Sequence, residues 1–151
     1  LFDEKKKELD FQGVYRLAAD GKLQLLNKDL SRPNGLAFSP DEKFLYVGNW
    51  GPEKKLVMRY EVNADCTVAN EKIFFDMTTA AGEDAIDGVK VDQKRNVYVS
   101  GPGGLWIFSP AGKHLGERNA RFRQQRMDVD VVLRLRPLRH DREFGRCDIP
   151  E

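Results

Sequence analysis

Two side chains that carry oxygen donors, Asn34 and Asp87, occupy matching places in the sequence, each directly before a glycine. They begin two similar segments, PNGLAFSPDEKFLYVGN (residues 33–49) and IDGVKVDQKRNVYVSG (residues 86–101). Amide and carboxylate oxygens are ligands that hard divalent cations such as calcium prefer. The pattern therefore predicts two metal-capable ligands at equivalent positions of successive structural units.

The repeat also predicts the kind of unit that positions these ligands. Asn34 and Asp87 are 53 residues apart, and the matching tyrosines Tyr46 and Tyr98 are 52 residues apart. A period of this size in a strand-rich sequence is typical of a propeller blade, which has four antiparallel strands. Short alternating apolar segments bounded by turn residues give the expected strands. They are residues 13–17, 23–26, 35–39, 44–48, 56–62, 71–75, 88–91, 96–100 and 104–108.

Turn chemistry supports this assignment. Asp20-Gly21, between two apolar segments, predicts a type I′ hairpin, in which both central residues have positive φ. Residues 13–22 (GVYRLAADGK) resemble residues 104–113 (GLWIFSPAGK), so we expect them to be the same part of two blades. Aromatic side chains at strand spacing are expected to pack between the blades. They are Phe38, Tyr46, Phe74, Phe75, Tyr98 and Trp106.

The length of the regular part limits the number of blades. Residues 1–116 suffice for a little over two units of the observed period. Propellers have about four to eight blades, so two blades cannot close a ring and leave exposed edges. We therefore expect an all-β chain that forms part of a larger propeller.

The composition changes abruptly after residue 116. All 12 lysines and 12 of the 13 glycines lie in residues 1–116, whereas nine of the 13 arginines lie in residues 117–151. We treat residues 117–151 as an atypical arginine-rich tail, and a shifted reading frame is one hypothesis for its origin. Seven acidic residues are interspersed among these arginines, which argues against a nucleic-acid-binding tail.

Several function classes are disfavoured by the residues. No run approaches the roughly 18 apolar residues of a membrane span, and a net charge of +1 favours neither membranes nor nucleic acid. The sequence has no His-Glu-x-x-His zinc motif and no Gly-x-Ser-x-Gly nucleophile elbow. Localisation and oligomeric state are left open.

The segments RPNGLAFSPDEKFLYVGN, DGVKVDQKRNVYVSGPGGLWIFSPAGKHLG and ELDFQGVYRLAADGKLQLL resemble the gluconolactonase, regucalcin (senescence marker protein) and lactonase family. The resemblance covers roughly residues 8–116. It implies a six-bladed β-propeller with one divalent metal near the axis, most often calcium, with zinc or magnesium as alternatives. It also implies hydrolysis of a sugar lactone to an aldonic acid.

The resemblance assigns roles to the two corner residues. It makes Asn34 a metal ligand, and Asp87 both a metal ligand and the general base. A glutamate ligand from the first blade and a substrate-binding asparagine have no counterpart in this chain, and Ile86 stands where the family commonly has proline. Asn49 and Trp50 are candidates for the pocket wall or for an ordinary loop.

Three interpretations follow. The chain is part of a metal-dependent sugar-lactone hydrolase, it is a non-enzymatic propeller module that binds a ligand or a protein, or it is an inactive truncated relative of the enzyme. With two protein ligands, we expect the metal to bind weakly.

Overall fold

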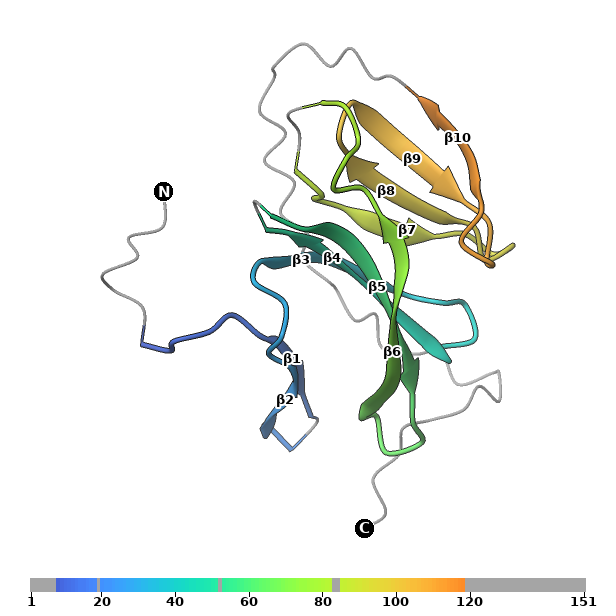
Figure 1. Cartoon of the computed structure of the whole chain (residues 1–151). Coiled ribbons are helices and arrows are strands. Elements are labelled where there is room, and N and C mark those ends of the chain that lie inside the picture. Colours follow the sequence, from blue (N-terminus) through green and yellow to red (C-terminus); the bar gives the residue numbers. More distant parts are fainter. Residues whose placement is uncertain (1–7, 19, 52, 83–84, 119–151) are drawn as a thin grey trace.

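The computed structural model describes residues 8–18, 20–51, 53–82 and 85–118 (Figure 1). These residues form ten strands in three antiparallel sheets. The strands are β1 (Val14–Leu17), β2 (Leu23–Asn27), β3 (Pro33–Phe38), β4 (Phe44–Trp50), β5 (Lys55–Val62), β6 (Val68–Asp76), β7 (Val89–Val91), β8 (Val97–Gly101), β9 (Gly104–Phe108) and β10 (His114–Arg118). Within the described ranges, no helix is long and apolar enough to cross a membrane.

The sheets confirm the partial propeller. The first sheet is the hairpin β1–β2, the second has the order β3-β4-β5-β6, and the third has the order β7-β8-β9-β10. The two four-stranded sheets meet through their first strands, β3 and β7 (Figure 1). In each of these sheets every strand pairs with the next one in the sequence, as expected for a blade. The hairpin corresponds to the third and fourth strands of a further blade.

The strand boundaries largely follow the alternation of apolar residues. β6 is longer than expected, because it begins at Val68 rather than at residue 71. The sequence does not predict β10, because His114–Arg118 has no alternating pattern of apolar residues. This strand is defined by its pairing with β9. This strand ends two residues beyond residue 116, and residues 119–151 of the expected tail lie outside the described residues.

The type I′ prediction for the first hairpin is wrong. Gly21 has a φ of 82°, but the hydrogen bonds of this turn enclose a longer loop than the two residues of a type I′ hairpin. The amide of Gly21 donates to the carbonyl of Ala18, and the amide of Ala18 donates to the carbonyl of Lys22. This geometry is a tight turn followed by one left-handed residue, the usual form of the slightly longer hairpin loop.

The same turn recurs at the outer end of the other two sheets. Its left-handed position is occupied by Cys66, with a φ of 62°, in the β5–β6 turn, and by Gly112, with a φ of 82°, in the β9–β10 turn. The three hairpins are therefore equivalent, as the similarity of residues 13–22 and 104–113 predicts.

The core lies between the sheets rather than within one of them. Tyr46 and Val57 from the second sheet pack with Val97, Val99 and Phe108 from the third sheet. A second cluster joins the hairpin to the other face of the second sheet, and it includes Val14, Leu30, Leu45, Val47 and Tyr60. Each blade is thus stabilised by burial against its neighbours.

Aromatic rings extend the core between the second and third sheets. The Phe74 ring lies edge-on to Tyr46 with ring centroids 5.0 Å apart, and Phe75 lies 4.4 Å from Phe108 by the same measure. The prediction of inter-blade packing is wrong for Phe38, which is 49% exposed at the end of β3. It is also wrong for Tyr98, which lies on the opposite face of β8 from the buried Val97 and Val99. Alternation alone could not show that no described sheet covers these two residues.

An ion pair joins equivalent turns of neighbouring blades. Arg95 Nη2, in the β7–β8 turn, lies 3.0 Å from Asp41 Oδ2, in the β3–β4 turn. Asp41 Oδ1 also accepts a hydrogen bond from Ser39 Oγ at 2.7 Å. The Ser39 hydroxyl, and then the Arg95 charge, keep the pKa of Asp41 below its ordinary value of 3.8.

We expect the Asp41→Asn substitution to lower the free energy of unfolding at pH 7 by less than about 1 kcal/mol, because the ion pair is partly exposed. The pKa of Asp41 is lower in the folded state, so its contribution is complete above the ordinary pKa. The contribution is lost as the pH falls through the lowered pKa of the folded protein. Urea unfolding of both proteins between pH 7 and pH 2 measures this. Equal pH dependence for Asp41→Asn and for Asp29→Asn, an exposed carboxylate outside these turns, would contradict the assignment.

Candidate functional site

The two corner residues lie at the beginning of neighbouring inner strands. Asn34 is the second residue of β3, and Asp87 lies two residues before β7. Both side chains are exposed. Because β3 and β7 are adjacent, the two corners lie side by side although 53 residues separate them in the sequence.

The Asn34 and Asp87 side chains are in contact. Asn34 Nδ2 donates a hydrogen bond to Asp87 Oδ1 at 3.3 Å and another to the backbone carbonyl of Ile86 at 3.3 Å. The amide and the carboxylate therefore meet at the junction of two blades, as the repeat predicts. An asparagine side chain can exchange the positions of its oxygen and nitrogen by rotating about its last torsion. Rotation would turn the amide oxygen toward the carboxylate at the cost of this hydrogen bond, an arrangement that a cation bound by both oxygens would favour.

A backbone hydrogen bond fixes the distance between the two corners. The amide of Gly35 donates to the carbonyl of Asp87 at 2.8 Å. A Cβ atom at residue 35 would collide with this carbonyl oxygen and would lie 2.8 Å from the amide nitrogen of Val89. Neither Gly35 nor Gly88 has a positive φ, so a left-handed backbone conformation does not require a glycine at either position. Gly35 is required by the close approach of the two strands.

The Asp87 corner is held by Ser100 of β8. The amide of Asp87 donates to the carbonyl of Ser100 at 3.1 Å, and the amide of Gly88 donates to Ser100 Oγ at 2.7 Å. The amide of Ser100 in turn donates to the carbonyl of Gly88 at 3.0 Å. Three hydrogen bonds therefore fix the backbone on both sides of the Asp87 side chain, which orients the carboxylate without using its oxygens.

The equivalent position in the second sheet has no side chain. Gly48 aligns with Ser100, and a Cβ atom at residue 48 would lie 2.6 Å from Ile86 Cγ2. Ile86 is fully buried here. Ser100 was not among the predicted site residues. The difference between Gly48 and Ser100 in the aligned repeats was the available signal.

Asn49 holds the backbone that precedes the Asn34 corner. Its Oδ1 accepts a hydrogen bond from the amide of Arg32 at 2.8 Å, and its Nδ2 donates to the carbonyl of Lys54 at 2.9 Å. Asn49 is almost completely buried, so it positions the chain rather than presenting an oxygen to solvent. Trp50 is partly exposed, and the Arg32 guanidinium lies 4.9 Å from its ring centroid.

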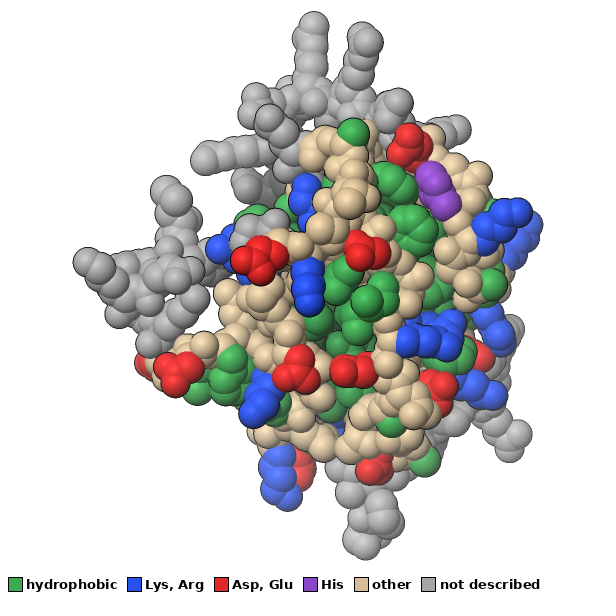
Figure 2. Space-filling model, viewed as in Figure 1, with side chains coloured by type: hydrophobic (Ala, Val, Ile, Leu, Met, Phe, Trp, Pro, Cys, Tyr) green, Lys and Arg blue, Asp and Glu red, His purple; other side chains and the backbone are tan. Residues whose placement is uncertain are grey.

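The larger of the two described hollows lies elsewhere. It has a volume of about 440 Å³ and is lined by residues that follow β2 and by parts of β4, β5 and β6. Figure 2 shows hydrophobic side chains gathered on this side of the molecule, with charged side chains around them. Neither Asn34 nor Asp87 lines it. The corner site is instead an open surface between two blades.

The side-chain oxygens of Asn34 and Asp87 could supply part of the ligands of a metal site. A neutral amide and a carboxylate suit a hard divalent cation, but calcium takes six to eight oxygen ligands. Among the described residues, no group of three or more His, Cys, Asp or Glu side chains could hold a metal ion. Asn34 and Asp87 would thus be two members of a larger ligand set.

Comparison with known proteins identifies the family. Residues 1–124 match the model of the SMP-30/Gluconolactonase/LRE-like region. The chain belongs to this family. It is 38% identical over 117 residues to a gluconolactonase from Zymomonas mobilis, and the match covers 73% of the chain and 32% of that protein.

Solved structures of the same family share the fold. A gluconolactonase from Xanthomonas campestris superposes with a TM-score of 0.65 at 32% identity, over 74% of this chain and 36% of the other. A calcium-binding protein, regucalcin, from Agrobacterium tumefaciens gives a TM-score of 0.59 at 25% identity, over 69% and 35% of the two chains. The chain thus spans about a third of the length of these relatives.

Proposed function

We propose that this chain is part of a metal-dependent sugar-lactone hydrolase, in which Asn34 and Asp87 bind the metal and Asp87 is the general base. The contact between Asn34 Nδ2 and Asp87 Oδ1, at 3.3 Å, is the observation that supports this proposal most directly. It brings an amide and a carboxylate from neighbouring blades to one exposed place. The relatives named gluconolactonase give the substrate class.

Each residue has a defined part in this proposal. Asp87 would remove a proton from a water molecule while that water attacks the lactone carbonyl carbon. The new carbon–oxygen bond forms as the ring carbon–oxygen bond breaks, and the released ring oxygen takes a proton to give the hydroxyl group of an aldonic acid. A bound divalent cation, with calcium as the first candidate, would polarise the lactone carbonyl. Asn34 would bind this cation together with Asp87, and its amide nitrogen would orient the Asp87 carboxylate. Ser100 would hold the backbone next to Asp87.

The two oxygens of Asp87 can act separately, one in the contact with Asn34 and the other in proton transfer. Oδ1 faces the Asn34 amide, and we assign the proton transfer to Oδ2. The exposure of this side chain leaves it accessible to water and to a small substrate.

Gluconolactone hydrolysis by the 151-residue chain, measured with and without calcium, tests this function. We expect calcium-dependent hydrolysis above the spontaneous rate and its loss in the Asp87→Ala variant. General acid–base groups typically contribute a factor of about 10² to 10⁴ in rate. If the two proteins have equal rates, the enzymatic assignment fails for this chain, and the alternatives of a binding module or an inactive relative take its place.

A further inference from the structure

The Asp87 corner contains a dipeptide that can rearrange its own backbone. Asp87 is followed by Gly88, and the sequence holds one other Asp-Gly pair, Asp20-Gly21, in the β1–β2 turn. An aspartate before a glycine is especially open to isomerisation, because glycine has no side chain that shields its amide nitrogen. In this reaction the Gly88 nitrogen attacks Asp87 Cγ and loses its proton, and one carboxyl oxygen leaves as water. The product is a cyclic succinimide.

Hydrolysis of the succinimide changes the course of the backbone. Attack of water at Cγ restores aspartate, whereas attack at the main-chain carbonyl carbon of residue 87 breaks its bond to the Gly88 nitrogen and gives isoaspartate. The water lost in the first step is regained, so the overall change is a rearrangement of the same atoms. The main chain then runs through the former side chain. The carbonyl of Asp87, which accepts the hydrogen bond from the Gly35 amide, becomes part of a free carboxylate.

The folded structure occupies the nitrogen that would attack. The amide of Gly88 donates a hydrogen bond to Ser100 Oγ at 2.7 Å. Ring closure requires this bond to break, because the nitrogen must turn toward the Asp87 side chain and give up its proton. Asp87 and Gly88 precede β7, so their hydrogen bonds to Ser100, and not the pairing of β7 with β8, hold these two residues. The Ser100 hydroxyl is therefore the group that stands between Asp87 and cyclisation.

The matching pair in the second sheet, Asn34-Gly35, is held without a hydroxyl group. It can undergo the same ring closure with ammonia as the leaving group. Both residues belong to β3, and the amide of Gly35 donates to the backbone carbonyl of Asp87 at 2.8 Å. The position that aligns with Ser100 is accordingly a glycine, Gly48. The hydroxyl thus occurs in the blade whose corner precedes the strand, where the backbone alone holds the corner less firmly.

We propose that Ser100 protects Asp87 from isomerisation, and that residue 87 becomes a site of isoaspartate formation when this hydroxyl is absent. The Asp87 side chain is exposed, so water reaches the corner to open the succinimide ring. This role is separate from the proposed hydrolysis, because it requires neither a metal nor a substrate. Its test measures a change in the backbone, and the result does not depend on whether Asp87 acts as a general base.

Prolonged incubation of the 151-residue chain, followed by peptide mapping that separates aspartate from isoaspartate by mass spectrometry, tests this proposal. In Ser100→Ala we expect isoaspartate at residue 87 to accumulate about five- to tenfold faster than in the unmodified chain, the factor that corresponds to one hydrogen bond. Ser100→Thr keeps a hydroxyl group and should match the unmodified chain. Asp20 is the internal reference and should isomerise at the same rate in all three proteins, because its turn belongs to another sheet.

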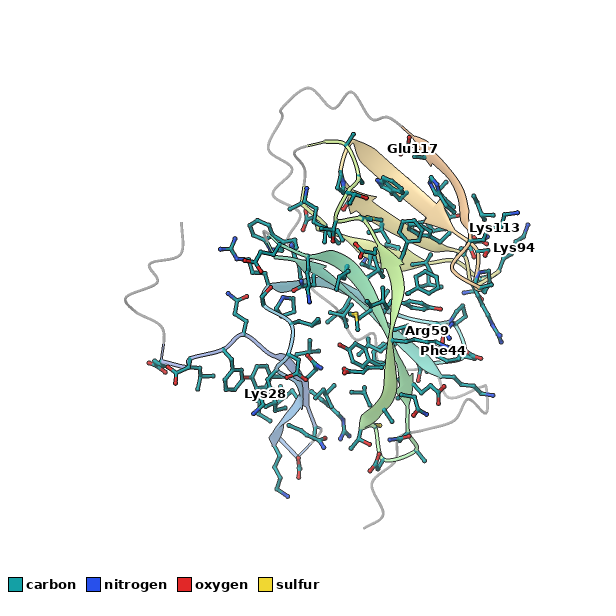
Figure 3. All side chains as sticks on the ribbon, in the orientation of Figure 1. Lys28, Phe44, Arg59, Lys94, Lys113 and Glu117 are labelled. Atoms are coloured by element: carbon teal, nitrogen blue, oxygen red, sulfur yellow. The ribbon has the colours of Figure 1, made fainter. Side chains whose placement is uncertain are left out.

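Ser39→Ala is the matched control for a general loss of stability. Ser39 Oγ accepts a hydrogen bond from the amide of Phe44 at 3.0 Å, so this substitution also removes a hydroxyl acceptor from a backbone amide. Phe44, which is labelled in Figure 3, begins β4 at the end of the second sheet away from the corners. We expect Ser39→Ala to leave the rate at residue 87 unchanged. Equal acceleration in Ser39→Ala and Ser100→Ala, or none in Ser100→Ala, would overturn the proposal.

The unmodified chain provides a second test that needs no variant. In concentrated urea the hydrogen bond to Ser100 is lost, and residue 87 should form isoaspartate at least about tenfold faster than in buffer. Asp20, which is exposed in the folded chain, should change its rate less. Equal rates at residue 87 in buffer and in urea would show that the folded corner gives no protection, and the proposal would then fail.

Discussion

The Asp87→Asn variant should bind calcium at least about tenfold more weakly than the unmodified chain, a change of about 1.4 kcal/mol. Asparagine has nearly the same shape as aspartate, and its side-chain oxygen can still accept the hydrogen bond from Asn34 Nδ2. The hydrogen bonds between Ser100 and the backbone of residues 87 and 88 do not involve the carboxylate. The substitution therefore removes the negative charge and little else, and the charge of the ligand set governs calcium affinity.

Chemical-shift changes of the backbone amides of residues 34 and 87 during a calcium titration measure this effect, and this method suits weak binding. Asp29→Asn is the matched control, because it removes one exposed carboxylate from the segment between β2 and β3. We expect the control to bind calcium like the unmodified chain. An equal loss of affinity in both variants would mean that calcium responds to the overall charge and not to a site at the two corners.

Gly35→Ala should destabilise the fold strongly, by about 3 kcal/mol, whereas Gly88→Ala should cost less than about 1 kcal/mol. At residue 35 an added Cβ atom collides with the carbonyl oxygen of Asp87 and approaches the backbone of Val89, and neither is a flexible side chain that can move away. The strands must separate, which breaks the hydrogen bond from the Gly35 amide and opens the β3–β7 junction. At residue 88 the nearest atom to an added Cβ is Ser100 Oγ at 3.4 Å, an ordinary contact.

Urea unfolding followed by circular dichroism gives both free energies of unfolding. The two glycines occupy the same place in the repeat, so each serves as the control for the other. Similar losses of stability in the two variants would contradict the packing of the corners described above.

The sequence predicted the architecture well because the architecture repeats. Alternating apolar residues located nine of the ten strands, and the aligned corners brought Asn34 and Asp87 to one place. The metal-binding and catalytic roles of these two residues remain predictions. The wrong local predictions have a common cause, because turn geometry and side-chain exposure depend on neighbouring segments that the sequence of one strand does not specify. The β1–β2 turn type and the exposure of Phe38 are set by the surrounding backbone and by the neighbouring sheet.

Ser100 was not predicted, and Asn49 was predicted to be part of the pocket wall or of an ordinary loop, whereas both residues support the backbone of the corners. Ser100 and Asn49 act through hydrogen bonds to backbone atoms of residues 12 and 17 positions away. Their residue types are common in loops and strands alike, so no motif distinguishes them, and only the replacement of Gly48 by Ser100 in the second repeat draws attention to Ser100. Their position relative to the corners becomes visible only when β4 and β8 are seen to pair with β3 and β7.

The contact between Ile86 and Gly48 limits which substitutions these two positions can accept during evolution. The branched side chain fills space that exists only because residue 48 has no Cβ atom. A larger residue at 48 is then tolerated only after a smaller one appears at 86, so the order of the two mutations matters. Such pairwise epistasis would tie the divergence of one blade to that of its neighbour, and it would leave a correlated pair of substitutions beside the Asp87 corner.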